Sequence, residues 1–153
     1  MIHKRFDKKL FEDNDLAARI HSASLLEKYG YKVKDHPDIY AQDLVATKGD
    51  KTFYVECEVK HAWKTNDFPF DSVQLPERKK KFCNSKTLFI IINSIKTKAI
   101  MFWSKDVLAS PLVEVSNKYI QSGEKFFQIP LDATKEVTLD DSNIRCGEYG
   151  NEA

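Results

Sequence analysis

The alternating run of residues 52–63 constrains the fold more than any other part of the sequence. Apolar and polar side chains alternate there with period two, which predicts a β-strand with one face in the core and the other outside it. The core face is assigned Phe53, Val55, Cys57 and Val59, and the outer face is assigned Tyr54, Glu56, Glu58 and Lys60. The strand is therefore expected to carry two carboxylates and an ammonium group side by side.

A second extended run precedes this strand at residues 39–47, and the segment between the two runs contains Gly49 and has the composition of a turn. The pair predicts a β-hairpin. A symmetric hairpin centred on Gly49 would place Asp43 opposite Val55, on the core face. A bulge or a longer loop would be needed to shift Asp43 toward Glu58.

The other elements predict an α/β fold. Residues 13–29 have helical spacing and end at Gly30, and residues 88–92 form a continuous apolar run typical of a strand buried on both faces. Further predicted elements are an edge strand at 31–33, a short basic helix at 77–82 after Pro76, a strand at 99–103, a helical turn at 105–108 and a late edge strand at 126–130, with 111–119 ambiguous. The expected architecture is a central mixed β-sheet flanked by α-helices, with a helix on each face.

Composition bounds the class of protein. A chain of 153 residues is long enough for one core, so a single domain is expected over 1–140, with a flexible C-terminal tail at 141–153. The three cysteines are far apart and odd in number, which argues against a disulfide framework or a zinc knuckle. The four histidines have no ligand spacing. No apolar run approaches the roughly 18 residues of a membrane helix, so a cytoplasmic protein without a membrane partner is expected.

Charge is unevenly distributed, although the net charge is only +1. Residues 51–105 contain eleven basic and five acidic side chains, whereas residues 106–153 contain four basic and nine acidic ones. A basic middle beside an acidic end is compatible with a local polyanion-binding face.

The charged face of the hairpin contains the groups that phosphodiester hydrolysis requires. Mg²⁺ prefers oxygen ligands and is commonly held by one or two carboxylates, with water and phosphate completing its shell. Asp43 and Glu58, from neighbouring strands, could supply that pair, and Lys60 could orient the attacking water or stabilise the charge developing on phosphorus. The alternative is that Glu56, Glu58 and Lys60 form a solvated strand face.

Three segments in this order resemble the PD-(D/E)XK nuclease superfamily, which is restriction-endonuclease-like and includes the archaeal Holliday-junction resolvases. They are the helix end at 25–31, the aspartate segment at 43–46 and the acid-x-lysine element at 58–60. The resemblance implies a Mg²⁺-dependent deoxyribonuclease, a phosphodiester hydrolase in which Mn²⁺ can substitute. It also implies a metal bound by Asp43, Glu58 and the Val59 carbonyl, with Lys60 beside the water.

The chain departs from that pattern in two places. Gln42 stands where the family has a proline, which carries no chemistry. An acidic residue of the first helix adds a metal ligand in many relatives, but the matching position is Arg19, with Asp15 one turn earlier and Glu12 earlier still. A further open alternative concerns Glu56, which either contributes to the metal site or pairs with a lysine.

DNA is the expected partner. The candidate nucleic-acid-binding residues lie in and just before the predicted basic helix and are Gln74, Arg78, Lys79 and Lys80. Trp63 and Phe68 either stack on a base or pack in the core or a lid. Whether duplex, single-stranded or branched DNA is the substrate stays open, and a homodimer is one possibility. The competing hypothesis is a catalytically inactive nucleic-acid-binding or protein-interaction module of the same fold.

Overall fold

The computed structural model describes residues 8–117 and 120–139, and it describes side chains from Asn14 onward apart from positions 116–122. In chain order the elements are α1 (Lys8–Lys28), β1 (Lys32–Asp35), β2 (Leu44–Lys48), β3 (Lys51–Lys60), β4 (Ser72–Pro76), the 3₁₀ helix η1 (Glu77–Asn84), β5 (Thr87–Asn93), β6 (Lys98–Trp103), α2 (Ser104–Leu108), β7 (Leu112–Asn117), β8 (Ile120–Pro130), the 3₁₀ helix η2 (Leu131–Ala133) and β9 (Lys135–Thr138). The predicted tail at 141–153 lies outside the described residues.

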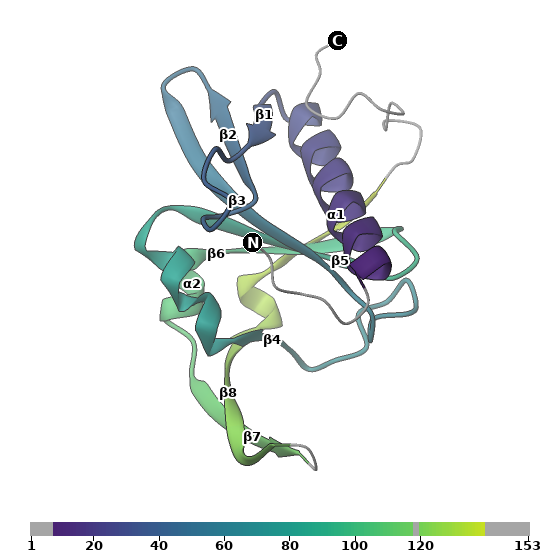
Figure 1. The fold of residues 1–153 in the computed structure, drawn as a ribbon, viewed down its shortest axis with the longest axis vertical. Coiled ribbons are helices and arrows are strands. Elements are labelled where there is room, and N and C mark those ends of the chain that lie inside the picture. The colour runs from purple at the N-terminus through teal and green to yellow at the C-terminus, as the bar shows by residue number, and fades with distance from the viewer. Residues whose placement is uncertain (1–7, 118–119, 140–153) are drawn as a thin grey trace.

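A six-stranded sheet with the order β1-β2-β3-β5-β6-β9 forms the centre of the molecule. The β3–β5 pair is parallel and the other pairs are antiparallel, so the sheet is mixed. Figure 1 shows α1 beside this sheet and the β7–β8 hairpin projecting away from it. The predicted fold class, a mixed sheet with helices in an α/β domain, is confirmed.

The two faces of the sheet are covered differently. The face that carries Phe53, Val55 and Cys57 packs with α1 residues such as Leu26. On the opposite face, a second core contains side chains from β5, β6, η1, α2 and the small sheet β4-β8-β7. The predicted core face of β3 is confirmed, because Phe53, Val55 and Cys57 are buried. By alternation, Glu56 projects to the opposite face.

The strand predicted over 39–47 begins only at Leu44. Asp38 accepts a hydrogen bond from the Tyr40 amide through Oδ1 at 2.9 Å, and the Ala41 amide donates to the Asp38 carbonyl at 3.0 Å. This local turn replaces the sheet pairing that Ile39 would favour, since an aspartate can bond to the backbone two residues ahead.

Three predictions elsewhere were incomplete or wrong. Strands β4 and β9 were not predicted: Pro69 and Asp71 just before β4 are typical of a loop, and β9 has a single apolar residue, Val137. Strand β8 was predicted at an edge but is the central strand of the small sheet, between β4 and β7.

In the described part of the chain no helix is long and apolar enough to cross a membrane.

The register of the β2–β3 hairpin differs from the prediction. The turn contains two residues, Gly49 at φ 62° and Asp50, so that Lys48 pairs with Lys51 and Leu44 pairs with Val55. A positive φ is typical of two-residue hairpin turns. Because the centre lies between two residues instead of on Gly49, the next position, Asp43, falls beside Glu56. No bulge interrupts these two described strands.

Candidate active site

Asp43 lies at the point where β2 begins and fills the space beside β3. Its Oδ2 accepts a hydrogen bond from the Cys57 amide at 3.0 Å. Strand β2 pairs with β3 only as far as Val55, so the Cys57 amide has no strand partner on that side. The Asp43 carboxylate satisfies this donor and is thereby fixed in place.

Gln42, which stands where the PD-(D/E)XK pattern has a proline, anchors the start of β2. Its side chain is 7% exposed, and its Nε2 donates to Thr87 Oγ1 at 3.0 Å and to the Phe82 carbonyl at 3.4 Å. The hydroxyl of Thr87 also donates to the Phe82 carbonyl at 2.7 Å. A buried amide needs such partners, and here they join Asp43 to the end of η1 and the start of β5.

Glu56 forms an ion pair with Lys79. Nζ of Lys79 lies 2.5 Å from Glu56 Oε2, and the two side chains are only 15% and 11% exposed. Lys79 reaches β3 because η1 follows Pro76 directly and turns back over the sheet. Of the two alternatives for Glu56, pairing with a lysine is therefore observed. The lysine is Lys79, which had been predicted to contact DNA.

Burial and neighbouring charge raise the pKa of both carboxylates. Desolvation, joined by the negative charge of Asp43, raises the pKa of Glu56 to about 7, although Lys79 opposes this shift. Desolvation also raises the pKa of Asp43, with Asp15 adding to the effect and the Cys57 amide, Lys79 and Arg19 opposing it. Burial is the larger cause in both cases, so each carboxyl group holds its proton to a higher pH than an exposed one would.

The pKa of Lys79 shifts in the opposite direction from that of an isolated buried lysine. Burial alone would lower its pKa, but the charges of Glu56, Glu58 and Asp43, with the hydrogen bond to Glu56, raise it. Lys79 is therefore a stable ammonium group at neutral pH, within reach of the electrostatic influence of all three carboxylates.

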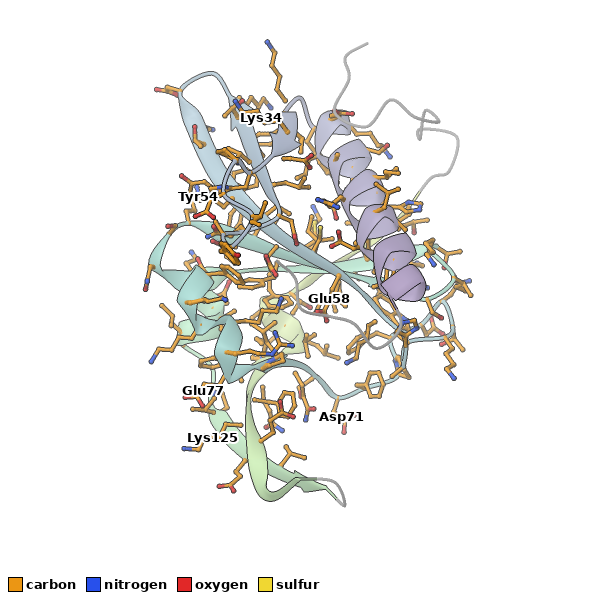
Figure 2. The ribbon with its side chains drawn as sticks, in the orientation of Figure 1. Lys34, Tyr54, Glu58, Asp71, Glu77 and Lys125 are labelled. Atoms are coloured by element: carbon orange, nitrogen blue, oxygen red, sulfur yellow. The ribbon has the colours of Figure 1, made fainter. Side chains whose placement is uncertain are left out.

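Glu58 and Lys60 lie farther along the same face of β3. Tyr54 and Glu58, both labelled in Figure 2, mark the course of this face from the hairpin toward the centre of the molecule. Glu58 is half-buried. Nζ of Lys60 lies 5.4 Å from the ring centroid of Phe70, a cation–π contact. The predicted same-face arrangement of Glu58 and Lys60 is thus present, but Lys60 contacts an aromatic ring.

Helix α1 contributes one acidic side chain near Asp43. Asp15 pairs with Arg19 at 2.6 Å, and its charge is among the causes that raise the pKa of Asp43. Asp15 is therefore the first-helix candidate that the described structure supports as a neighbour of the site. Glu12 lies outside the residues whose side chains are described.

A divalent cation would need oxygen ligands from this cluster. Across the described residues, no group of three or more His, Cys, Asp or Glu side chains is close enough to hold an ion by itself. Asp43 and Glu56 nevertheless bring together two partly dehydrated carboxyl groups, each of which raises the pKa of a neighbour or has its own pKa raised by burial. Mg²⁺ commonly uses one or two carboxylates, with water and phosphate as its other ligands. The residues therefore fit a cation that substrate helps to bind.

The predicted DNA-contact residues are distributed between surface and interior. Gln74, Arg78 and Lys80 are exposed, whereas Lys79 is engaged with Glu56. Of the two aromatic candidates, Trp63 is fully buried, and its Nε1 donates to the Asp67 carbonyl at 3.0 Å. Trp63 is therefore a core residue.

The second aromatic candidate lies beside the first. The rings of Phe68 and Trp63 are in edge contact at 5.0 Å, and the half-buried Phe68 packs against the second core. Packing is therefore observed for both residues. The buried Cys57 thiol, whose pKa is raised by burial, faces the α1 side as predicted.

No sequence signal identified the Lys79–Glu56 pair, because residues 23 positions apart meet only through the path of β4 and η1. The one available hint was that η1 contains four consecutive cations, residues 78–81, which cannot all lie on one face of a helix.

Similarity to known proteins was found among solved structures. No protein-family model matches the chain, and no curated protein matches it. Among solved structures, the Holliday junction resolvase Hjc of the archaeal hyperthermophile Archaeoglobus fulgidus is similar, with a TM-score of 0.42 and 12% sequence identity over 82% of this chain and 84% of that chain. The assignment of the site therefore rests on the residues of this chain.

Proposed function

We propose that this chain is a metal-dependent nuclease that hydrolyses DNA phosphodiester bonds. The observation that carries the proposal is the cluster of Asp43, Glu56 and Lys79, in which two carboxylates with raised pKa share a half-buried place with one ammonium group. Such a combination is costly to bury, and groups with perturbed pKa values of this kind cluster at functional sites. The motif order noted in the sequence supports the same reading.

In this proposal Asp43 and Glu56 hold Mg²⁺ or Mn²⁺, with Glu58 as the next carboxylate along the strand. When bound, the cation would neutralise charge on the phosphate and lower the pKa of water. Asp43 is oriented by its hydrogen bond with the Cys57 amide, and Asp15 adds negative charge from α1.

Lys79 is proposed as the lysine of the site. Its ammonium group already lies against Glu56 and is held charged by three carboxylates. On substrate binding it can turn from Glu56 to a phosphate oxygen, where a fixed positive charge stabilises the charge that develops during hydrolysis.

A competing assignment retains the arrangement expected from the motif, with Asp43, Glu58 and the Val59 carbonyl on the metal and Lys60 beside the water. The contact of Lys60 with Phe70 favours Lys79 over Lys60. The exposed Arg78, Lys80 and Gln74 would contact DNA phosphates in either case.

The test is a cleavage assay on plasmid, single-stranded and branched DNA with Mg²⁺, Mn²⁺ or EDTA. We expect metal-dependent products from the wild-type protein and none from Asp43→Asn or Glu56→Gln. Asp50→Asn, which changes an exposed carboxylate in the turn of the same hairpin, is the matched control and should cleave normally. Products that persist in Asp43→Asn would remove the assignment.

The second candidate function is DNA binding without hydrolysis. It is favoured by one observation, that Lys79 already engages Glu56 as an ion pair. This candidate predicts salt-sensitive DNA binding by fluorescence anisotropy, no products with any metal, and no effect of Mg²⁺ on the melting temperature.

A further inference from the structure

A pocket of about 470 Å³ lies between the end of η1 and the start of α2, apart from the carboxylate cluster. The residues that line it are Cys83, Ser85, Lys86, Trp103, Ser104, Lys105 and Leu108. Its volume is within the range of roughly 300–1,000 Å³ that is typical of small-ligand sites. None of these residues has a role in the proposed hydrolysis.

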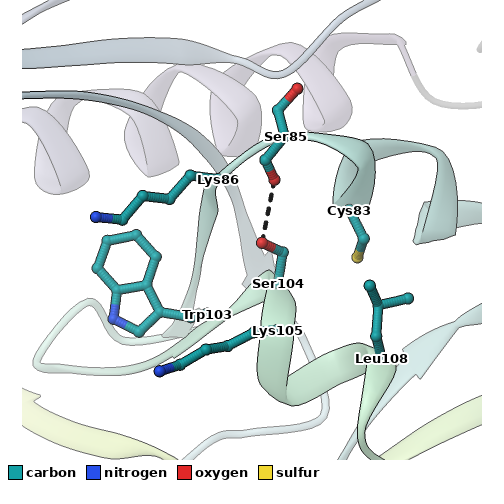
Figure 3. Close-up of a pocket in the computed structure, with 7 residues that line it drawn as sticks. All are labelled: Cys83, Ser85, Lys86, Trp103, Ser104, Lys105 and Leu108. Atoms are coloured by element: carbon teal, nitrogen blue, oxygen red, sulfur yellow. Dashed lines mark hydrogen bonds between the residues drawn. The ribbon is translucent and has the colours of Figure 1, made fainter.

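Hydrogen bonds fix the middle of the pocket. Ser104 Oγ donates to the Ser85 carbonyl at 3.1 Å and accepts from the Thr87 amide at 3.1 Å, so the start of α2 is tied to the start of β5. In Figure 3, Trp103 and the two lysines lie on one side of this bond, and Cys83 and Leu108 lie on the other. The walls are therefore preformed.

The aromatic wall is half-buried and held in place. The ring of Trp103 packs edge-on against Phe53 with centroids 5.0 Å apart. The opposite wall contains Leu108, 51% exposed, and the buried thiol of Cys83. Flat and apolar surfaces of this kind favour a planar ring over a sugar or an ion.

The polar groups of the pocket are mainly cationic. Lys86 and Lys105 are both exposed, and among the described residues neither forms an ion pair. Nζ of Lys86 lies 5.1 Å from the Trp103 ring centroid, so a cation stands next to the aromatic face. Of the lining residues, none is acidic. The pocket therefore complements an anion that carries an aromatic ring.

We propose that this pocket binds one nucleotide, with the base against Trp103 and the phosphate between Lys86 and Lys105, on the side of the Ser104–Ser85 bond where these three side chains lie. Stacking on the accessible part of an aromatic ring tolerates any base, and lysines contact phosphate as point charges. The nucleotide is either free or part of a DNA strand, and the chemistry of recognition is shared. Binding here requires no cleavage, so the inference goes beyond the proposed function.

Tryptophan fluorescence measures this binding directly. The chain has two tryptophans, and Trp63 is fully buried, so quenching by an added ligand reports on Trp103. The wild-type protein would be titrated in EDTA with deoxyadenosine monophosphate, with deoxyadenosine and with a single-stranded dT oligonucleotide. We expect quenching by the phosphorylated ligands and binding at least tenfold weaker for the nucleoside.

Variants separate the pocket from general electrostatics. Lys86→Ala with Lys105→Ala should weaken binding at least tenfold, whereas Lys51→Ala with Lys34→Ala, at two exposed positions elsewhere, should change it less than twofold. Trp103→Ala should also weaken binding, measured by calorimetry, and Trp103→Phe should retain most of it because stacking persists. Circular dichroism and melting temperature would verify folding.

Each outcome has a defined meaning. Quenching by the mononucleotide identifies a free nucleotide as a ligand, and quenching by the oligonucleotide alone identifies a nucleotide within a strand. Absence of both, or equal binding by the two double-lysine variants, would overturn the proposal. Asp43→Asn should leave quenching intact, so that loss of cleavage and loss of pocket binding are distinguished.

Discussion

One face of β3 has an inner half, at Glu56, and an outer half, at Glu58 and Lys60, and the side chains of the two halves have different partners. At the inner half, Glu56 lies beside Asp43 and is ion-paired with Lys79, with 11% of its side chain exposed. At the outer half, two and four residues farther along β3, Glu58 is half-buried and Lys60 contacts the ring of Phe70. The same alternation placed all these side chains on one face.

The difference comes from the neighbouring elements. Strand β2 begins at Leu44, so the Asp43 carboxylate can turn into the space beside Cys57, and η1 brings Lys79 back over β3 at the same level. Position on a strand face therefore does not determine chemical environment. The end of the adjacent strand and a helix distant in sequence determine it here.

The largest expected effect comes from removing the inner carboxylates. Asp43→Asn and Glu56→Gln should each lower the rate of DNA cleavage by about 10³-fold or more, because each removes a ligand charge of the proposed metal site. The amide oxygen that Asp43→Asn introduces would still accept the hydrogen bond from the Cys57 amide, so folding should be retained. The measurement is single-turnover cleavage with Mg²⁺. A similar loss in Asp50→Asn would show that the effect is not specific.

The second effect compares the two lysines. Lys79→Met should reduce the cleavage rate by roughly 10²–10³-fold, the range for loss of one positioned charge or donor, whereas Lys60→Met should reduce it less than tenfold. Lys79→Arg should recover part of the rate, since it keeps the positive charge. The opposite ranking, with Lys60→Met the more damaging, would move the site to Glu58, the Val59 carbonyl and Lys60.

The sequence predicted the elements whose signal is local. The alternation of β3, the buried run of β5 and the helix before Gly30 each follow from periodicity within about a dozen residues, and each is present. The hairpin register was wrong by one residue, because a turn of two residues and a turn centred on Gly49 have nearly the same composition. That single step moved Asp43 from the core side to the side of Glu56.

What the sequence could not predict depends on contacts between distant segments. The Glu56–Lys79 pair requires the path of β4 and η1, and the anchoring of Gln42 requires that Thr87 and the Phe82 carbonyl meet it. Neither leaves a periodic pattern. The predicted Asp43, Glu58 and Lys60 share a strand pair, but the ion pair with Lys79 that distinguishes Glu56 from Glu58 arises only in the folded chain.

The third effect is on stability as a function of pH. Burial and Asp43 raise the pKa of Glu56 from 4.5 to about 7, so between these values the folded protein binds a proton that the unfolded chain releases. The stabilising contribution is present below about pH 4.5 and is lost as pH rises through about 7. The size is on the order of 3 kcal/mol, since one pKa unit corresponds to about 1.4 kcal/mol.

Urea unfolding in EDTA from pH 5 to pH 8 would measure this loss as a falling free energy of unfolding. Glu56→Gln should flatten the dependence, and Glu58→Gln is the matched comparison for the outer half of the strand face. If the wild-type protein becomes more stable across this range and Glu56→Gln does not change the slope, Glu56 does not have the raised pKa that distinguishes the inner half from the outer half.

The smallest effect tests whether η1 shows a similar contrast, between Lys79, which is paired with Glu56, and its exposed neighbour Arg78. Arg78 is exposed and lies next to the mostly buried Lys79. Arg78 can therefore contact a phosphate without disturbing the ion pair between Lys79 and Glu56. Arg78→Ala should weaken binding of duplex DNA only a few-fold and lower the slope of log affinity against log salt by about 0.9, the value for one phosphate contact. Anisotropy titrations at several salt concentrations, in EDTA, measure the slope, and the single-turnover rate at saturating protein should stay within about twofold. If Arg78→Ala instead abolished cleavage at saturation, the cations of η1 would act as one unit and the separation of an inner catalytic lysine from outer binding residues would fail.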